Sequence, residues 1–170
     1  MTSASSLPVP ATPAWQGTAP DPLADPTLYD GIRSRRVFGY FIDVAIIVVI
    51  AMAIWFALVF AGIVTLGLLL PLVPIAVAVV PIAYHSLFVG GPRSATWGMQ
   101  MFDVEVRSWT GNRPTLGQAF LMTALFLVSI GLTGFVILLV SLFNGRGRTA
   151  HDLLSGTVVI RRSALERRGG

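Results

Sequence analysis

Residues 33–60 read RSRRVFGYFIDVAIIVVIAMAIWFALVF, a long apolar stretch that begins with arginines and contains a single carboxylate, Asp43. No charged residue occurs from position 44 to position 60. In a helix, about 20 apolar residues cross the hydrocarbon core of a bilayer, which is about 30 Å thick. The stretch therefore predicts a membrane-spanning helix over residues 35–62, with Asp43 about two turns inside it.

Asp43 is unusual because ionisable residues within a membrane span are rare and commonly functional. Arg36 lies seven residues earlier and therefore on nearly the same face of the helix. Two interpretations are open. Asp43 is a carboxylate that binds a partner or carries a proton, or it is an interfacial residue that pairs with Arg36 and orients the helix.

Composition places the chain among integral membrane proteins, since 54% of its 170 residues are hydrophobic and only 12% are charged. All twelve basic residues are arginines, and the net charge is +4. Because these arginines flank apolar segments, they predict contact with lipid headgroups rather than with nucleic acid.

Catalytic and metal-binding chemistry has little support in the sequence. The chain has no cysteine, which excludes disulfides, thiolate metal sites and cysteine nucleophiles. Two histidines, His85 and His151, are too few for a metal site alone, and the sequence shows no phosphate-binding glycine loop. Ser155 near His151 and Asp152 is typical of a turn rather than of a catalytic triad. No enzymatic activity and no cofactor are expected.

Three regions are predicted along the chain. Residues 1–30, rich in Pro, Ala and Ser, predict a disordered tail in which Trp15 and Tyr29 are candidates for membrane-surface contact. Residues 31–162 form the transmembrane domain, and residues 163–170 a frayed basic tail. Within the domain, residues 68–89 predict a second span bent by prolines, with His85 as an interfacial anchor near its end.

Residues 102–107 and 157–160 have the alternation or β-branched content of strands. Between them lies a third apolar region, 116–143, which is either one tilted span or a hairpin of two short helices. A hairpin places all arginines in the cytoplasm, as the positive-inside rule favours, and lets the two strands pair. The predicted fold is an all-α membrane protein with three apolar regions and a small cytoplasmic pair of β-strands.

The ordered pattern resembles the RDD family of bacterial membrane proteins, which is named for one arginine and two aspartates. The matching residues are Arg36 and Asp43 in RRVFGYFID and Asp152 in RTAHDLLSGTVVI, and the segment 95–106, ATWGMQMFDVEV, is similar to a Thr-x-Gly-Lys segment and the strand after it. The resemblance covers about residues 32–161. Met99 stands where the family often has Lys, Asp103 where Gly is common, and Met122 where many members carry Arg.

The resemblance implies a multi-pass protein of the bacterial inner membrane, with the N-terminus expected in the cytoplasm. The family has no settled biochemical function, although transport has been suggested and some members are linked to cation/proton exchange. Because this chain has methionine at two positions where the family often has a basic residue, an anion site at Met99 and Met122 is not expected.

Two hypotheses follow for Arg36, Asp43 and Asp152, with His151 and His85 as secondary candidates. In the first, a carboxylate held partly out of water beside an arginine exchanges a proton for a cation. In the second, Arg36 clamps Asp43 and Asp152 together in a membrane scaffold or partner subunit. The expected partners are the lipid bilayer and either further copies of the chain or another membrane protein.

Overall fold

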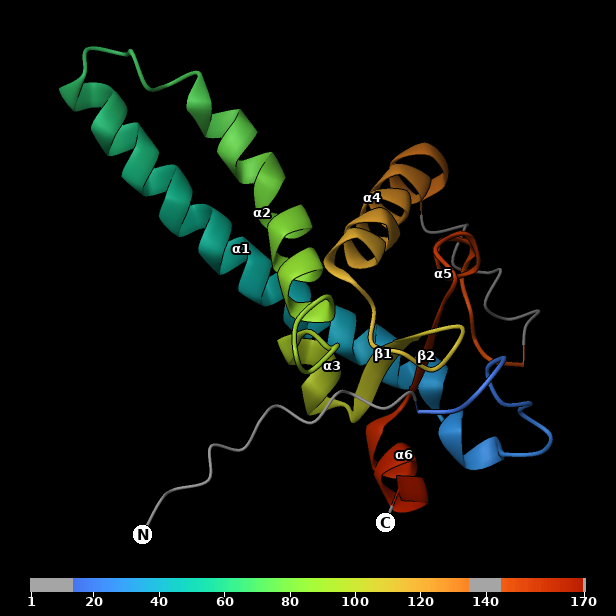
Figure 1. The fold of residues 1–170 in the computed structure, drawn as a ribbon. Coiled ribbons are helices and arrows are strands. Elements are labelled where there is room, and N and C mark those ends of the chain that lie inside the picture. Colours follow the sequence, from blue (N-terminus) through green and yellow to red (C-terminus); the bar gives the residue numbers. More distant parts are fainter. Residues whose placement is uncertain (1–13, 135–144, 170) are drawn as a thin grey trace, which may run out of the picture.

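The structure, a computed structural model, describes residues 14–134 and 145–169 (Figure 1). Its elements in order are η1 (Pro26–Leu28), α1 (Ile32–Val64), α2 (Leu72–Val89), α3 (Trp97–Met101), β1 (Val104–Ser108), α4 (Leu116–Thr133), α5 (Ala150–Leu154), β2 (Thr157–Arg161) and α6 (Arg162–Gly169). By length and composition, α1, α2 and α4 can each cross a membrane. The prediction of a mostly helical membrane protein with a small sheet is confirmed.

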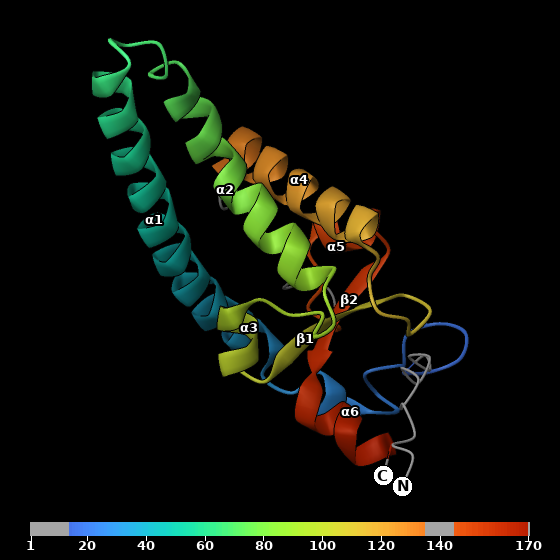
Figure 2. The same ribbon diagram turned by 60° about the vertical axis from the view of Figure 1, so that its left-hand side comes forward.

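Helix α1 is longer than a bilayer requires. Its 33 residues extend about 50 Å, compared with a hydrocarbon core of about 30 Å. The far part of α1 forms a hairpin with α2, whereas its first turns run past the sheet, as two views show (Figures 1 and 2). The arginine-rich start of α1 therefore belongs to the same unit as the strands.

Helix α2 begins at Leu72, four residues after the predicted start at residue 68. Pro71 is its N-cap and Pro74 falls in its first turn, where the missing N–H costs no helical hydrogen bond. Pro81 lies inside the helix. The prolines therefore set where α2 starts.

Strands β1 and β2 form the predicted pair, which is antiparallel, with Val106 opposite Val159. β1 begins two residues later than expected, because Asp103 has a φ of +59° and belongs to the preceding turn. Few residues other than glycine adopt this left-handed conformation. The geometry explains why glycine suits this position.

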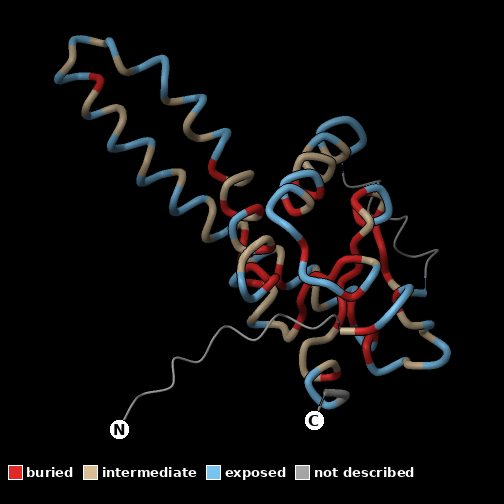
Figure 3. The backbone as a smooth tube through the Cα atoms, in the orientation of Figure 1, coloured by how far each residue is buried: buried red, intermediate tan, exposed pale blue. Residues whose placement is uncertain are grey.

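Two apolar clusters cover the two faces of the sheet. The inner cluster joins the sheet to the bases of the long helices and contains Ile32, Val89, Val104, Val106, Ala119, Met122 and Val159. The outer cluster contains Trp15, Ala19, Leu28, Tyr29, Val158, Ile160 and Ala164. Buried residues therefore concentrate around the sheet, whereas the far ends of α1 and α2 are largely exposed (Figure 3).

The outer cluster shows ordered structure where disorder was expected. Residues 14–30 cover one face of β2, with Leu28 fully buried and the Trp15 indole donating a hydrogen bond to the carbonyl of Trp109. Trp15 and Tyr29 therefore pack in the outer cluster instead of projecting toward a membrane surface. Residues 163–169, expected to be frayed, belong to α6, since Ala164 packs in the same cluster. Residues 1–13 lie outside the described part of the chain.

The paired strands also restrict the path of the third apolar region. β1 precedes this region and β2 follows it, so both of its ends lie on one side of any membrane. Gln118, in the first turn of α4, donates a hydrogen bond of 2.8 Å to the carbonyl of Ser155, just before β2. These contacts place the start of α4 beside the segment that leads into β2, as the predicted hairpin requires. The second arm of the predicted hairpin falls largely on residues 135–144, outside the described residues.

Asp103 gives a first test of these contacts. Its carboxylate accepts hydrogen bonds from the Ser163 backbone N–H at 2.9 Å and hydroxyl at 2.5 Å, which fixes the start of α6. We expect Asp103→Ala to lower the thermal unfolding temperature, since it loses these bonds and keeps the strained φ. Asp103→Gly loses the same bonds but relieves the backbone, so it should be more stable than the alanine variant by about 1 kcal/mol. Equal unfolding temperatures for the two variants would contradict this account of Asp103.

Candidate functional site

The three charged residues expected in one cluster lie in two separate sites. Arg36 contacts Asp152, with 2.5 Å between Nη1 and Oδ2. Among the described residues, no hydrogen bond or ion pair joins Arg36 to Asp43. Their difference of seven positions corresponds to about 10 Å along α1, which explains the separation.

The first site surrounds Asp43, which is only 1% exposed. Its carboxylate accepts hydrogen bonds from the Tyr84 hydroxyl at 2.8 Å, the Thr96 hydroxyl at 2.5 Å and the Gly98 backbone N–H at 2.8 Å. Tyr84 lies on α2, and Thr96 and Gly98 lie at the start of α3. One carboxylate on α1 therefore connects three helices.

The Gly98 contact depends on glycine at two positions. The backbones of α1 and α3 cross at Gly39 and Gly98, where a Cβ built on Gly98 would overlap the Gly39 carbonyl oxygen and lie 2.8 Å from Cγ of Asp43. A Cβ on Gly39 would lie 3.2 Å from the Gly98 carbonyl. A side chain at Gly98 would therefore push α3 away from Asp43.

The start of α3 is prepared for this carboxylate. Thr96 is its N-cap, and its hydroxyl accepts the Met99 N–H while donating to Asp43. The Tyr84 hydroxyl accepts the Trp97 N–H at 3.3 Å and likewise donates to Asp43. Among the described residues, the hydrogen-bond donors to this carboxylate are all neutral groups of the chain itself, so the site has the properties of an internal tie.

The second site surrounds Asp152, whose side chain is fully buried. Thr149 and Asp152 form a capping box at the start of α5, in which the Thr149 N–H donates to Oδ2 of Asp152 at 2.9 Å. Arg36 Nη1 also donates to the Gly147 carbonyl at 3.2 Å. Burial opposes ionisation of Asp152, but Arg36, His151 and Thr149 outweigh it and lower the pKa of this carboxyl group. The pair connects α1 to the segment before β2.

His151 adjoins this ion pair in a neutral state. Burial, opposed by Asp152 and reinforced by Arg36, lowers the pKa of His151 to about 4. The Thr149 hydroxyl donates to Oδ2 of Asp152, so we assign the proton of the 2.8 Å contact between Thr149 and His151 to Nε2. Two buried acceptors, His151 Nδ1 and Asp152 Oδ1, have no hydrogen-bond donor among the described residues.

The remaining candidates have other roles. His85 packs against the ring of its neighbour Tyr84, with centroids 5.4 Å apart, and so lies beside the Asp43 site. Met99 and Met122 both contact the inner apolar cluster. In the described residues, no group of three or more His, Asp or Glu side chains is suited to hold a metal ion.

Sequence reasoning missed most of the groups around the carboxylates. The segment 95–106 was recognised as a motif, but nothing in it indicated that Thr96 and Gly98 contact Asp43. Nothing in the sequence around His85 indicated that its neighbour Tyr84 donates a hydrogen bond to Asp43. The order Thr96-x-Gly98 at a helix start was a usable signal for a contact with a carboxylate. Threonine is a common N-cap, and a glycine two positions later leaves the first backbone N–H groups of the helix accessible.

Comparison with known proteins confirms the family resemblance predicted from the sequence motifs. The sequence profile described as the RDD family matches residues 32–156. This range contains both sites, from Arg36 to Asp152. No curated protein and no solved structure matches the chain.

The close approach at Gly98 can be tested with two alanine substitutions. We expect Gly98→Ala to lower the unfolding temperature markedly, since overpacking costs about 1–3 kcal/mol and the Asp43 hydrogen bonds are displaced as well. Gly117→Ala is the matched control, because Gly117 lies in the first turn of α4 and a Cβ there meets nothing within 4 Å. Comparable losses in the two variants would show that the α1–α3 crossing is not tight.

His151 predicts a pH dependence of stability. Its pKa is 6.5 when unfolded and about 4 when folded, so the unfolded chain binds the proton first and stability falls as the pH decreases from 6.5 to 4. The full effect is roughly 3 kcal/mol. We expect His151→Gln to flatten this part of the curve of unfolding temperature against pH. A curve of unchanged slope in the variant would assign the acid sensitivity to other groups.

Proposed function

Because this match covers most of the chain, the chain belongs to the RDD family, and we propose that it is a membrane scaffold or partner subunit rather than a transporter. The observation that carries the proposal is the environment of Asp43. Its carboxylate is buried and faces three donors from the chain itself. A transported cation would have to displace these donors and separate α1 from α3.

Arg36 supports the same conclusion. For Asp43 to exchange a proton for a cation, a positive charge beside it would have to oppose the effect of burial. Arg36 instead lies against Asp152 and the Gly147 carbonyl. Arg36, Asp43 and Asp152 are thus used to join the spans to the sheet. An assembly role then falls to the exposed apolar faces of α1, α2 and α4, toward lipid or a membrane partner.

The proposed orientation places the sheet and the N-terminus in the cytoplasm of a bacterial cell. Arginines occur in the first turns of α1 and in the segments around the sheet, whereas residues 65–71, which join α1 to α2 at the opposite end, carry no charge. The positive-inside rule assigns the arginine-rich end to the cytoplasm.

Proton and cation transport is the second candidate. The observation in its favour is the pair of buried acceptors, His151 Nδ1 and Asp152 Oδ1, which lack donors among the described residues. Buried acceptors without donors are rare, and a proton, a cation or a water molecule would satisfy them.

The two candidates are separated by measuring flux and stability on the same purified proteins. Vesicles containing the wild-type protein are exposed to sodium, potassium or lithium gradients while internal pH is followed. A scaffold gives no cation-dependent proton flux, and Asp43→Asn lowers the unfolding temperature. Arg36→Ala lowers it too, because an unpaired buried carboxylate costs about 3–5 kcal/mol. Arg167→Ala, at an exposed position on α6, is the control.

The contrary outcome is equally definite. Cation-dependent flux by the folded wild-type protein would establish a transporter, and loss of that flux in Asp43→Asn or in Asp152→Asn at an unchanged unfolding temperature would identify its carboxylate. Absence of flux counts for the scaffold only when the reconstituted protein retains its cooperative thermal transition.

A further inference from the structure

The end of α2 and the start of α4 lie at the same level of the molecule. A Cβ on Gly90, the C-cap of α2, would lie 2.8 Å from Cα of Leu116, the first residue of α4. Both helices are candidate spans. The loops that flank Gly90 and Leu116 therefore lie where apolar helices leave the hydrocarbon core and lipid headgroups begin.

Two exposed arginines occupy these loops. Arg113 donates a hydrogen bond to the Pro92 carbonyl, which places it beside the backbone of Arg93. Arg93 donates to the side-chain oxygen of Gln100 at 3.2 Å. Both partners are neutral, and among the described residues no ion pair joins either arginine to a carboxylate. Arg93 and Arg113 therefore form a patch with two positive charges that no carboxylate of the described residues neutralises.

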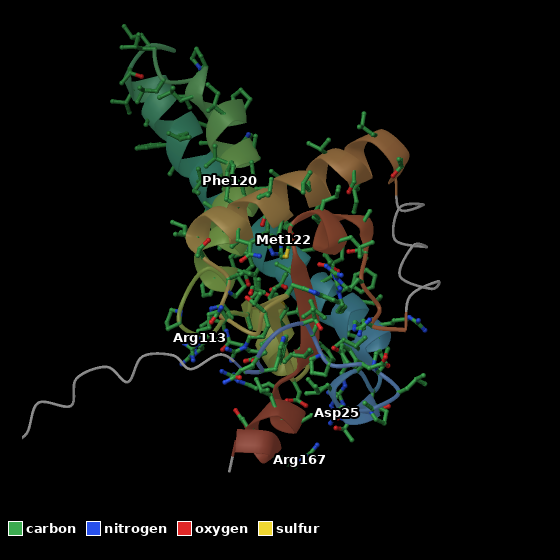
Figure 4. The ribbon with its side chains drawn as sticks, turned by 45° about the vertical axis from the view of Figure 1, so that its right-hand side comes forward. Asp25, Arg113, Phe120, Met122 and Arg167 are labelled. Atoms are coloured by element: carbon green, nitrogen blue, oxygen red, sulfur yellow. The ribbon has the colours of Figure 1, made fainter. Side chains whose placement is uncertain are left out.

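The start of α4 adds to the attraction for anions. The Thr115 hydroxyl accepts the Gln118 N–H, whereas the N–H groups before it in α4 have no helical partner and carry a partial positive charge. Leu116 and Gly117 are exposed, and a Cβ on Gly117 meets nothing within 4 Å, so the first turn is open to approach. Figure 4 shows Arg113 below this end of α4, with Phe120 higher on the helix.

Apolar side chains lie next to the charges. Leu87 on α2, Trp97 on α3 and Leu116 on α4 are each more than half exposed. They lie within a few residues of the loops that carry Arg93 and Arg113. A phospholipid whose phosphate contacts the arginines would thus place its acyl chains against an apolar surface. A soluble anion would contact the arginines but not this apolar surface.

We propose that Arg93 and Arg113, with the first turn of α4, form a binding site for an anionic phospholipid at the base of α2 and α4. Phosphate suits this site because guanidinium groups and helix N-termini both donate hydrogen bonds to its oxygens. The site is independent of whether the protein is a scaffold or a transporter.

The test measures thermal unfolding of the full-length protein in phosphatidylcholine nanodiscs that contain increasing fractions of phosphatidylglycerol. The wild-type unfolding temperature should rise with the anionic fraction. In the double variant Arg93→Gln/Arg113→Gln, the apparent affinity should fall about fivefold for each arginine removed, the effect expected of one basic residue at an anionic surface. Unfolding in pure phosphatidylcholine should be the same for both proteins, because the two positions are exposed.

Arg167→Gln is the matched control. Arg167 is exposed on α6, at the end of the molecule away from the long helices (Figure 4). This variant should keep the full response to phosphatidylglycerol. An equal response in the double variant, or an equal loss in Arg167→Gln, would overturn the site in favour of general attraction between arginines and an anionic surface. A rise produced by inorganic phosphate in pure phosphatidylcholine would overturn the assignment to a lipid.

Discussion

The carboxylate of Asp43 is the interaction on which the rest of the structure depends. A buried carboxylate must find donors, and here they come from α2 and from the first turn of α3. Meeting that requirement brings α3 against α1 at Gly39 and Gly98, where backbone contacts leave no space for a side chain. It also ties α2 to α1 through the Tyr84 hydroxyl. A polar group inside an apolar helix is costly to bury, and that cost makes the geometry around it specific.

Arg36 and Asp152 provide a second tie, one that spans most of the sequence. Asp152 is held by the capping box at the start of α5, and Arg36 reaches it from the first turns of α1. The resulting contact brings the last part of the domain back to its beginning, beside the antiparallel pair of β1 and β2. Arg36 and Asp152 therefore interact at the end of the molecule where the helices meet the sheet, and not in the far part of the spans.

The distribution of exposed groups gives the molecule two different ends. At one end, α1 and α2 present apolar side chains almost without interruption. At the other end, arginines surround a sheet that is covered on both faces by apolar clusters. Between the two, Trp97 and Leu116 are exposed beside Arg93 and Arg113, as expected where hydrocarbon gives way to headgroups. Lipid contact therefore explains side chains that would be unfavourable in water.

The sequence by itself determined the class of the protein, its candidate spans, the presence of two strand segments and the identity of its charged residues. These follow from local properties: runs of apolar residues, alternation and a distinctive order of motifs. Only the tertiary structure decided that Arg36 and Asp43 belong to different sites, because a helical wheel shows the face that two residues share and not what packs against each. It also decided that residues 14–30 are ordered, since their apolar side chains gain order only from the face of β2 that they cover. Contacts between residues distant in sequence, such as Asp43 with Gly98, depend on how helices cross, and no local pattern encodes that crossing.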